Sequence, residues 1–143
     1  MFKLKKILNA RNNAPEYEIW DLNNAVLGTP GNIYTLFDGM LNTSFYDPNK
    51  SGDFYVCTKA MDDISSERKQ WCYRVTPDMI FETTVPSNYK FTVGQLVTLT
   101  EESNNCGYSS VAAGGDRETA DGIIVGANEG DSNKVLVRLF CKG

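Results

Sequence analysis

The sequence predicts a mostly β fold, a small single-domain β-barrel or sandwich with an extended N-terminal arm and little helix. Short runs of β-branched and aromatic residues recur along the chain, and clusters of Pro, Gly, Asn, Asp and Ser separate them. The chain has 143 residues, of which 41% are hydrophobic and 22% are charged, as in ordinary globular domains. We expect an arm over residues 1–15 and one β-rich domain over residues 16–143.

The first segment, Met1–Leu8, places lysines between apolar residues, and a polar linker follows it as far as Pro15. It lacks the apolar run and the cleavage site of a signal peptide, so we expect it in the mature protein. Residues 1–13 carry a charge of +4, which leaves −8 on the other residues for the total of −4. Two interpretations stay open: a basic arm that binds an acidic surface, or an edge strand with solvated lysines.

Residues 16–22 predict a strand with large apolar groups on both faces. Tyr17 and Ile19 alternate with Glu16, Glu18 and Trp20. We therefore expect this strand to contact something on each side.

Turn-forming residues then predict loops over 23–32 and 42–52. Between them, Ile33–Leu41 predicts a strand or a short helix. Asp53–Lys59 predicts a strand, and Ala60–Gln70 predicts a helical turn or a polar loop.

Trp71–Thr100 has the densest apolar pattern and contains three predicted strands. We expect it to form the central sheet of a scaffold, closed by the C-terminal strand Lys134–Cys141. Tyr108–Ala112 and Gly122–Gly126 predict two shorter strands, which brings the expected total to eight or nine.

The chain contains no histidine, so histidine-based triads and histidine metal sites are excluded. Cys57, Cys72, Cys106 and Cys141 lack zinc-motif spacing, and we expect reduced thiols, although four cysteines permit two disulfides. The acidic total argues against broad nucleic-acid binding, and no apolar run is long enough to cross a bilayer. The sequence predicts no enzyme activity, no cofactor and no metal.

Two groups of acids are weak candidates for chemistry. Asp116, Glu118 and Asp121 lie among glycines, but their spacing does not fit an EF-hand, which favours a solvated loop over a calcium site. Glu16 and Glu18 beside aromatic residues are compatible with a sugar-binding or glycosidase cleft, although an interface or core strand is favoured. Aromatic residues make up 11% of the chain, and core packing and an extensive protein interface both explain them.

Four segments follow one another in a characteristic order. KLKKILNARNNAPEYE (residues 3–18) leads to YRVTPDMIFETTV (73–85) and VGQLVTL (93–99), and residues 122–140 close with GIIVG, a Gly-Asp turn and KVLVRLF. In this order and spacing, over roughly two-thirds of its length, the chain resembles the capsid decoration or cement proteins, the head auxiliary proteins of tailed bacteriophages. Residues 19–70 depart from that pattern.

The resemblance implies a non-enzymatic virion structural protein, made in the host cytoplasm, that binds the outer surface of a phage capsid and stabilises it. Its partner would be the major capsid protein, with a homotrimer as one candidate assembly, and neither nucleic acid nor membrane is expected. The alternative is a carbohydrate- or receptor-binding β module of a head fibre or tail. The residues expected to bind the capsid or another partner are Phe2, Lys3, Leu4, Lys5, Lys6, Arg11, Tyr17 and Trp20.

Overall fold

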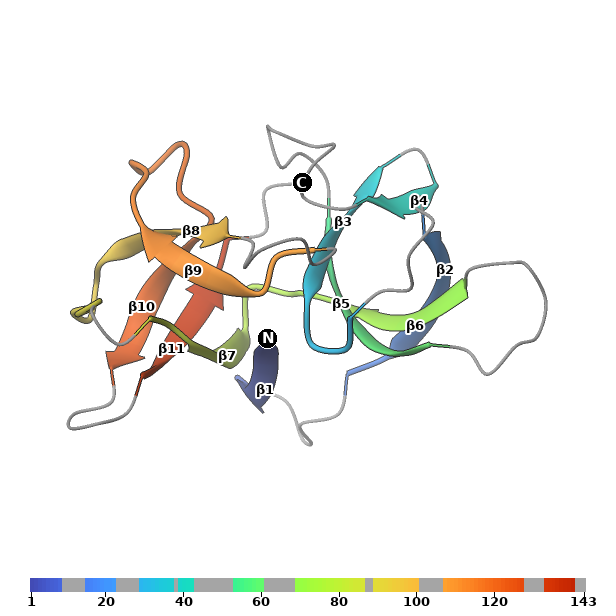
Figure 1. Ribbon diagram of the computed structural model, residues 1–143, viewed down its shortest axis with the longest axis horizontal. Coiled ribbons are helices and arrows are strands. Elements are labelled where there is room, and N and C mark those ends of the chain that lie inside the picture. The colour runs from blue at the N-terminus through green and yellow to red at the C-terminus, as the bar shows by residue number, and fades with distance from the viewer. Residues whose placement is uncertain are drawn as a thin grey trace.

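Eleven strands build the protein in the computed structural model, which describes residues 1–8, 15–22, 29–37, 39–42, 53–60, 69–86, 89–100, 107–127 and 133–140. The fold class expected from the sequence is confirmed, because the described residues form an all-β domain without helix. The strands make two sheets that lie side by side (Figure 1).

The first sheet has six strands in the order β1-β7-β11-β10-β8-β9, and all its pairings are antiparallel. These strands are β1 (Phe2–Ile7), β7 (Met79–Thr84), β8 (Leu96–Thr100), β9 (Ser110–Ala113), β10 (Gly122–Ala127) and β11 (Lys134–Leu139). The sheet curls until β9 approaches β7, where the Ser110 hydroxyl donates a hydrogen bond of 2.6 Å to the Thr84 carbonyl. The curl leaves an inner face on which one layer of side chains is buried.

The second sheet is a closed five-stranded barrel in the order β2-β4-β3-β5-β6. Its strands are β2 (Tyr17–Leu22), β3 (Ile33–Phe37), β4 (Met40–Asn42), β5 (Phe54–Ala60) and β6 (Lys69–Arg74). The β2–β4 pair is parallel, and the other four pairs are antiparallel. The antiparallel β2–β6 pair joins the two ends of this order and so closes the barrel.

Strand β5 is buried on both faces, which explains its unbroken apolar run. Phe54 and Val56 point into the main core, which the two sheets share, while Tyr55 and Cys57 point into a smaller cluster inside the barrel. Alternation along a strand sends successive side chains to opposite faces. A strand between two cores therefore needs apolar residues at both odd and even positions.

Short hydrogen-bonded links join the sheets. The Phe2 amide donates to the Gly31 carbonyl at 2.6 Å, and Ile33 and Tyr108 exchange two backbone hydrogen bonds of 2.8 Å. Strand β1, beside the label N in Figure 1, therefore contacts both β7 and the segment before β3.

The expectation that Trp71–Thr100 forms one central sheet is wrong. Strand β6 belongs to the barrel, whereas β7 and β8 belong to the six-stranded sheet, where β11 and β10 separate them. The chain changes sheets at a corner in which the Met79 amide donates to the Thr76 carbonyl at 3.1 Å. The predicted C-terminal strand does pair with part of that stretch, because β11 pairs with β7, but it lies inside the six-stranded sheet, between β7 and β10.

For two segments the sequence left a helix as one possibility, and the structure describes no helix in either of them. Strands β3 and β4 pair as an antiparallel hairpin, and Gly39, just before β4, has a φ of 75°. The two ends of the predicted helical turn at 60–70 are strand residues of β5 and β6, and residues 61–68 lie outside the described residues. The described strands number eleven rather than eight or nine.

Candidate functional site

Strand β1 exposes adjacent lysines because it contains a bulge. Strict alternation would put Phe2, Leu4 and Lys6 on the same inward face. The register with β7 shifts between Leu4 and Lys6, so Lys5 is an extra residue and Ile7 takes the next inward position. Phe2 is therefore buried, Leu4 and Ile7 are half-buried, and both lysines are exposed.

The outward side of β1 carries three ammonium groups. Lys5 Nζ lies 3.9 Å from Glu82 Oε2, and Lys134 Nζ lies 3.7 Å from Glu82 Oε1. Lys3 and Lys6 are exposed and make no ion pair with any of the residues that the structure describes. The two lysines are thus available to an acidic partner.

The structure separates the other predicted partner-binding residues. Phe2 is 2% exposed and stands edge-on to Phe81, so its side chain belongs to the core rather than to a contact surface. Trp20 packs against Tyr55 inside the barrel, with ring centroids 6.0 Å apart. Tyr17 is exposed, and Arg11 lies outside the described residues.

An apolar row runs across the outer face of the barrel, and we call it the outer apolar row. Tyr17, Ile19 and Trp71 are 55%, 43% and 37% exposed, and Met40 is 40% exposed. Ile19 and Trp71 are cross-strand partners, and Met40 pairs with Asp21, which lies two residues further along β2 on the same face. Exposed large apolar side chains that adjoin one another are typical of an interaction surface.

The sequence pattern identifies only part of this row. The alternation in β2 gives Tyr17 and Ile19 a common face, but the residues predicted from the sequence were Tyr17 and Trp20, and Ile19 was missed. Trp71 and Met40 join them through strand pairings that are distant in sequence. Nothing in the local pattern around either residue distinguishes it from a core residue.

A cleft of about 620 Å³ opens between the beginning of β2 and the corner after β6. Its lining combines two carboxylates, one guanidinium, one hydroxyl and two apolar side chains, from Pro15, Glu16, Glu18, Arg74, Thr76 and Met79. The two glutamates that the sequence singles out therefore do line a common cleft.

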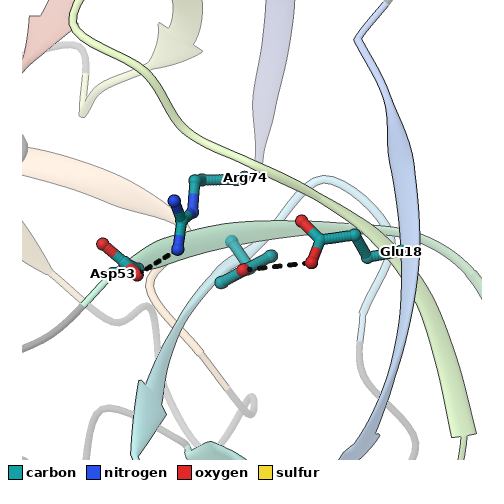
Figure 2. A network of polar contacts seen from close by, with 4 residues as sticks. Glu18, Asp53 and Arg74 are labelled. Carbon is teal, nitrogen blue, oxygen red and sulfur yellow. Dashed lines mark hydrogen bonds and ion pairs between the residues drawn. The ribbon is translucent and has the colours of Figure 1, made fainter.

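Two residues that line this cleft, Glu18 and Arg74, belong to a network of polar contacts (Figure 2). The Tyr55 hydroxyl donates to Glu18 Oε1 at 3.4 Å, and Arg74 makes an ion pair with Asp53. The Arg74 guanidinium carbon also lies 5.9 Å from the centre of the Tyr55 ring, within the range of a cation–π contact. Figure 2 shows Arg74 and Asp53 on one side of the network and Glu18 on the other.

The surroundings of Tyr55 favour the protonated form of its hydroxyl. Burial raises the pKa of the Tyr55 hydroxyl and the Glu18 charge adds to the rise, against the hydrogen bond from Arg74, which lowers it. The hydroxyl therefore stays protonated and remains a donor to Glu18. The hydrogen bond between Arg74 and Tyr55 raises the pKa of the Arg74 guanidinium, which therefore stays cationic. Glu18 and Arg74 are therefore held by contacts with Tyr55 and Asp53, whereas Glu16, which also lines the cleft, is exposed.

The acids of residues 116–121 serve the local backbone. Asp116 Oδ1 accepts hydrogen bonds of 2.9 Å from the amides of Glu118 and Thr119, and these bonds lower its pKa. Asp121 is buried, and its Oδ2 accepts the Leu99 amide at 2.8 Å. Among the described residues, no group of three or more Cys, Asp or Glu residues is arranged to hold a metal ion.

The part of the chain that the structure describes contains no helix long and apolar enough to cross a membrane. Comparison of the chain with models of protein families finds no match. Comparisons with curated proteins and with solved structures find no match either.

Proposed function

We propose that the protein is a non-enzymatic virion structural protein that binds the outer surface of a phage capsid and stabilises it. The observation that carries this proposal is the outer apolar row of Tyr17, Ile19, Met40 and Trp71 on the closed barrel. Aromatic and methionine side chains are enriched at the centres of protein interfaces. The resemblance to capsid decoration proteins supplies the identity of the partner, the major capsid protein.

The lysines of β1 supply a second element of the proposed contact. Lys3 and Lys6 are exposed cations on a chain whose total charge is −4. A cationic strand on an acidic protein favours encounter with an acidic partner surface and fixes its orientation. The apolar row would supply most of the binding free energy, because exposed ion pairs contribute little.

Co-sedimentation with empty capsid shells of the phage that encodes the chain tests this proposal. The wild-type protein should pellet with the shells and raise their melting temperature. Replacing Ile19 and Trp71 with serine should weaken binding at least about tenfold, as expected when two interface anchors are lost. Serine at Tyr89 and Val93, which are 50% and 68% exposed outside the row, is the matched control and should bind normally.

A folded wild-type protein that stays in the supernatant at all shell concentrations would contradict the proposal. Equal binding by the Ile19–Trp71 variant and its control would show that the outer apolar row is not the contact. Circular dichroism of each variant shows whether it is folded before binding is compared.

The cleft supports a second candidate, a carbohydrate- or receptor-binding β module. Glu16 and Glu18 line the same cleft of about 620 Å³, and carboxylates are good acceptors for sugar hydroxyls. A glycan array with wild-type protein and a Glu16→Gln, Glu18→Gln variant separates the two candidates. Selective glycan binding that the variant loses favours the second, and shell binding that the variant retains favours the first.

A further inference from the structure

Two cysteines face each other across neighbouring strands inside the barrel. Cys57 of β5 and Cys72 of β6 are direct register partners, and both side chains are 0% exposed. They belong to the interior cluster that also contains Tyr34, Leu41 and Tyr55. Both thiols are free in the structure.

The backbone hydrogen bonds show which kind of cross-strand pair the cysteines form. The Cys57 amide donates to the Asn32 carbonyl at 3.0 Å, and the Cys57 carbonyl accepts the Gly31 amide at 2.7 Å. Both polar groups of Cys57 therefore point away from β6. Cys57 and Cys72 form a non-hydrogen-bonded pair, the type in which side chains approach most closely.

The alternation of the β5–β6 ladder leads to the same result. The Val75 amide donates to the Phe54 carbonyl at 2.8 Å, which marks Phe54 and Val75 as a hydrogen-bonded pair. Pairs alternate in type along an antiparallel ladder, so the pair three positions further on, Cys57–Cys72, is not hydrogen-bonded. Such pairs have Cα atoms about 4.5 Å apart, and disulfides span about 4.4–6.8 Å between Cα atoms.

We propose that Cys57 and Cys72 are a cross-strand disulfide site, which closes when the chain folds in the presence of a disulfide oxidant such as oxidised glutathione. One cysteine thiolate attacks the glutathione disulfide and releases one glutathione thiol. The second cysteine thiolate then attacks the mixed disulfide and releases the other. The two protein sulfurs lose two electrons and two protons, and one glutathione disulfide becomes two thiols.

The burial of both sulfurs determines the stage of folding at which the disulfide can form. In the closed barrel neither sulfur is accessible to a glutathione molecule. Burial also raises the pKa of both thiols, that of Cys72 to about 12, so the thiolate needed for exchange is scarce in the folded state. The bond therefore forms while the barrel is open, and it is protected from reductants once the barrel has closed. This site is independent of the proposed capsid contact, which lies on the outer face of the barrel.

Refolding the full chain from denaturant in oxidised glutathione, followed by alkylation and peptide mass mapping, tests the proposal. We expect one predominant cross-link, a Cys57–Cys72 peptide pair two hydrogens lighter than its reduced form. A Cys106→Ser, Cys141→Ser variant keeps only the proposed pair and should give the same cross-link. Its oxidised form should melt several degrees above its reduced form, as expected for the closure of a loop of about 15 residues.

A parallel sample distinguishes the proposal from accidental oxidation. Protein folded under reducing conditions and then exposed to oxidised glutathione without denaturant should form the bond no faster than it unfolds. Refolded protein whose Cys57 and Cys72 both remain open to alkylation would overturn the proposal. So would a predominant link from either residue to Cys106 or Cys141.

Discussion

Tyr17 stands edge-on to Tyr73, with ring centroids 6.1 Å apart and ring planes at 89°. Tyr73 in turn stacks on Phe81, with centroids 6.4 Å apart and planes at 8°. Tyr17 is exposed on β2, Tyr73 is buried on β6, and Phe81 is buried on β7 of the other sheet. A single series of rings therefore connects the outer apolar row to the core between the two sheets.

The position of each ring in this series determines the effect of its removal. Tyr73→Ala should destabilise the fold by about 3 kcal/mol, because it leaves a cavity between the sheets. Tyr17→Ala removes an exposed ring and should cost less than about 1 kcal/mol, while it should weaken shell binding. Urea denaturation measures the first effect and co-sedimentation the second. Equal losses of stability would show that Tyr17 is a core residue rather than a surface anchor.

Gly107 lies between β8 and β9 of the six-stranded sheet, just before Tyr108 pairs with Ile33 of the barrel. Its φ is 92°, and a Cβ there would lie 2.7 Å from Tyr34 Cζ and 3.0 Å from the Ile33 carbonyl oxygen. Gly107→Ala should therefore combine backbone strain of about 1–2 kcal/mol with overpacking of about 1–3 kcal/mol. Its unfolding midpoint in urea should fall well below that of the wild type.

Gly94 provides a matched control for this substitution. It has the same φ of 92°, but nothing lies within 4 Å of a Cβ built there. Gly94→Ala should show the backbone strain alone, about 1–2 kcal/mol. If the two variants lose the same stability, the contact with Tyr34 contributes nothing.

A strand could be predicted from the sequence where its own residues and the turns beside it define its position. Strand β7 is an example, because β-branched and aromatic residues of 79–84 lie between Pro77 and Pro86, which mark turns on either side. The hairpin of β3 and β4 depends on the contact between these two strands, and a run such as 33–41 is ambiguous without that contact. Local pattern therefore identifies strands better than it identifies their partners.

The assignment of strands to two sheets depends on contacts distant in sequence. The turn before Met79 was predictable, but not the change of sheet that follows it, because residues on both sides of the turn are equally apolar. The same holds for the candidate site. Trp20 and Tyr17 are both aromatic residues of β2, and only closure of the barrel decides that Trp20 faces inward.

Alkaline pH should destabilise the fold through its buried thiols. Burial, with a smaller contribution from the Glu18 charge, raises the pKa of Cys72 from 9.0 to about 12, and burial also raises the pKa of Cys57. The unfolded chain therefore loses these protons at lower pH than the folded chain does. Stability from this source is complete below pH 9.0 and is lost as pH rises toward about 12. Each thiol contributes a slope of up to about 1.4 kcal/mol per pH unit.

Urea denaturation between about pH 8 and pH 11 under reducing conditions measures this slope. Cys72→Ala removes one titrating thiol, so its stability should decline less steeply than that of the wild type, whatever its stability at neutral pH. Parallel declines for the two proteins would show that Cys72 titrates alike in the folded and unfolded chains.

The lysines of β1 should contribute a salt-dependent part of shell binding. Lys3→Gln with Lys6→Gln removes two exposed cations without touching the buried side of the strand. If each contributes about 0.5–1 kcal/mol at low salt, the two together contribute about 1–2 kcal/mol, and affinity should fall about five- to thirtyfold. The difference should shrink at high salt, where exposed charges are screened. Lys90→Gln with Arg117→Gln is the matched control, because both residues are exposed and lie outside β1, in the β7–β8 and β9–β10 connections. Equal losses for the two double variants would mean that total charge, rather than the lysines of β1, governs binding.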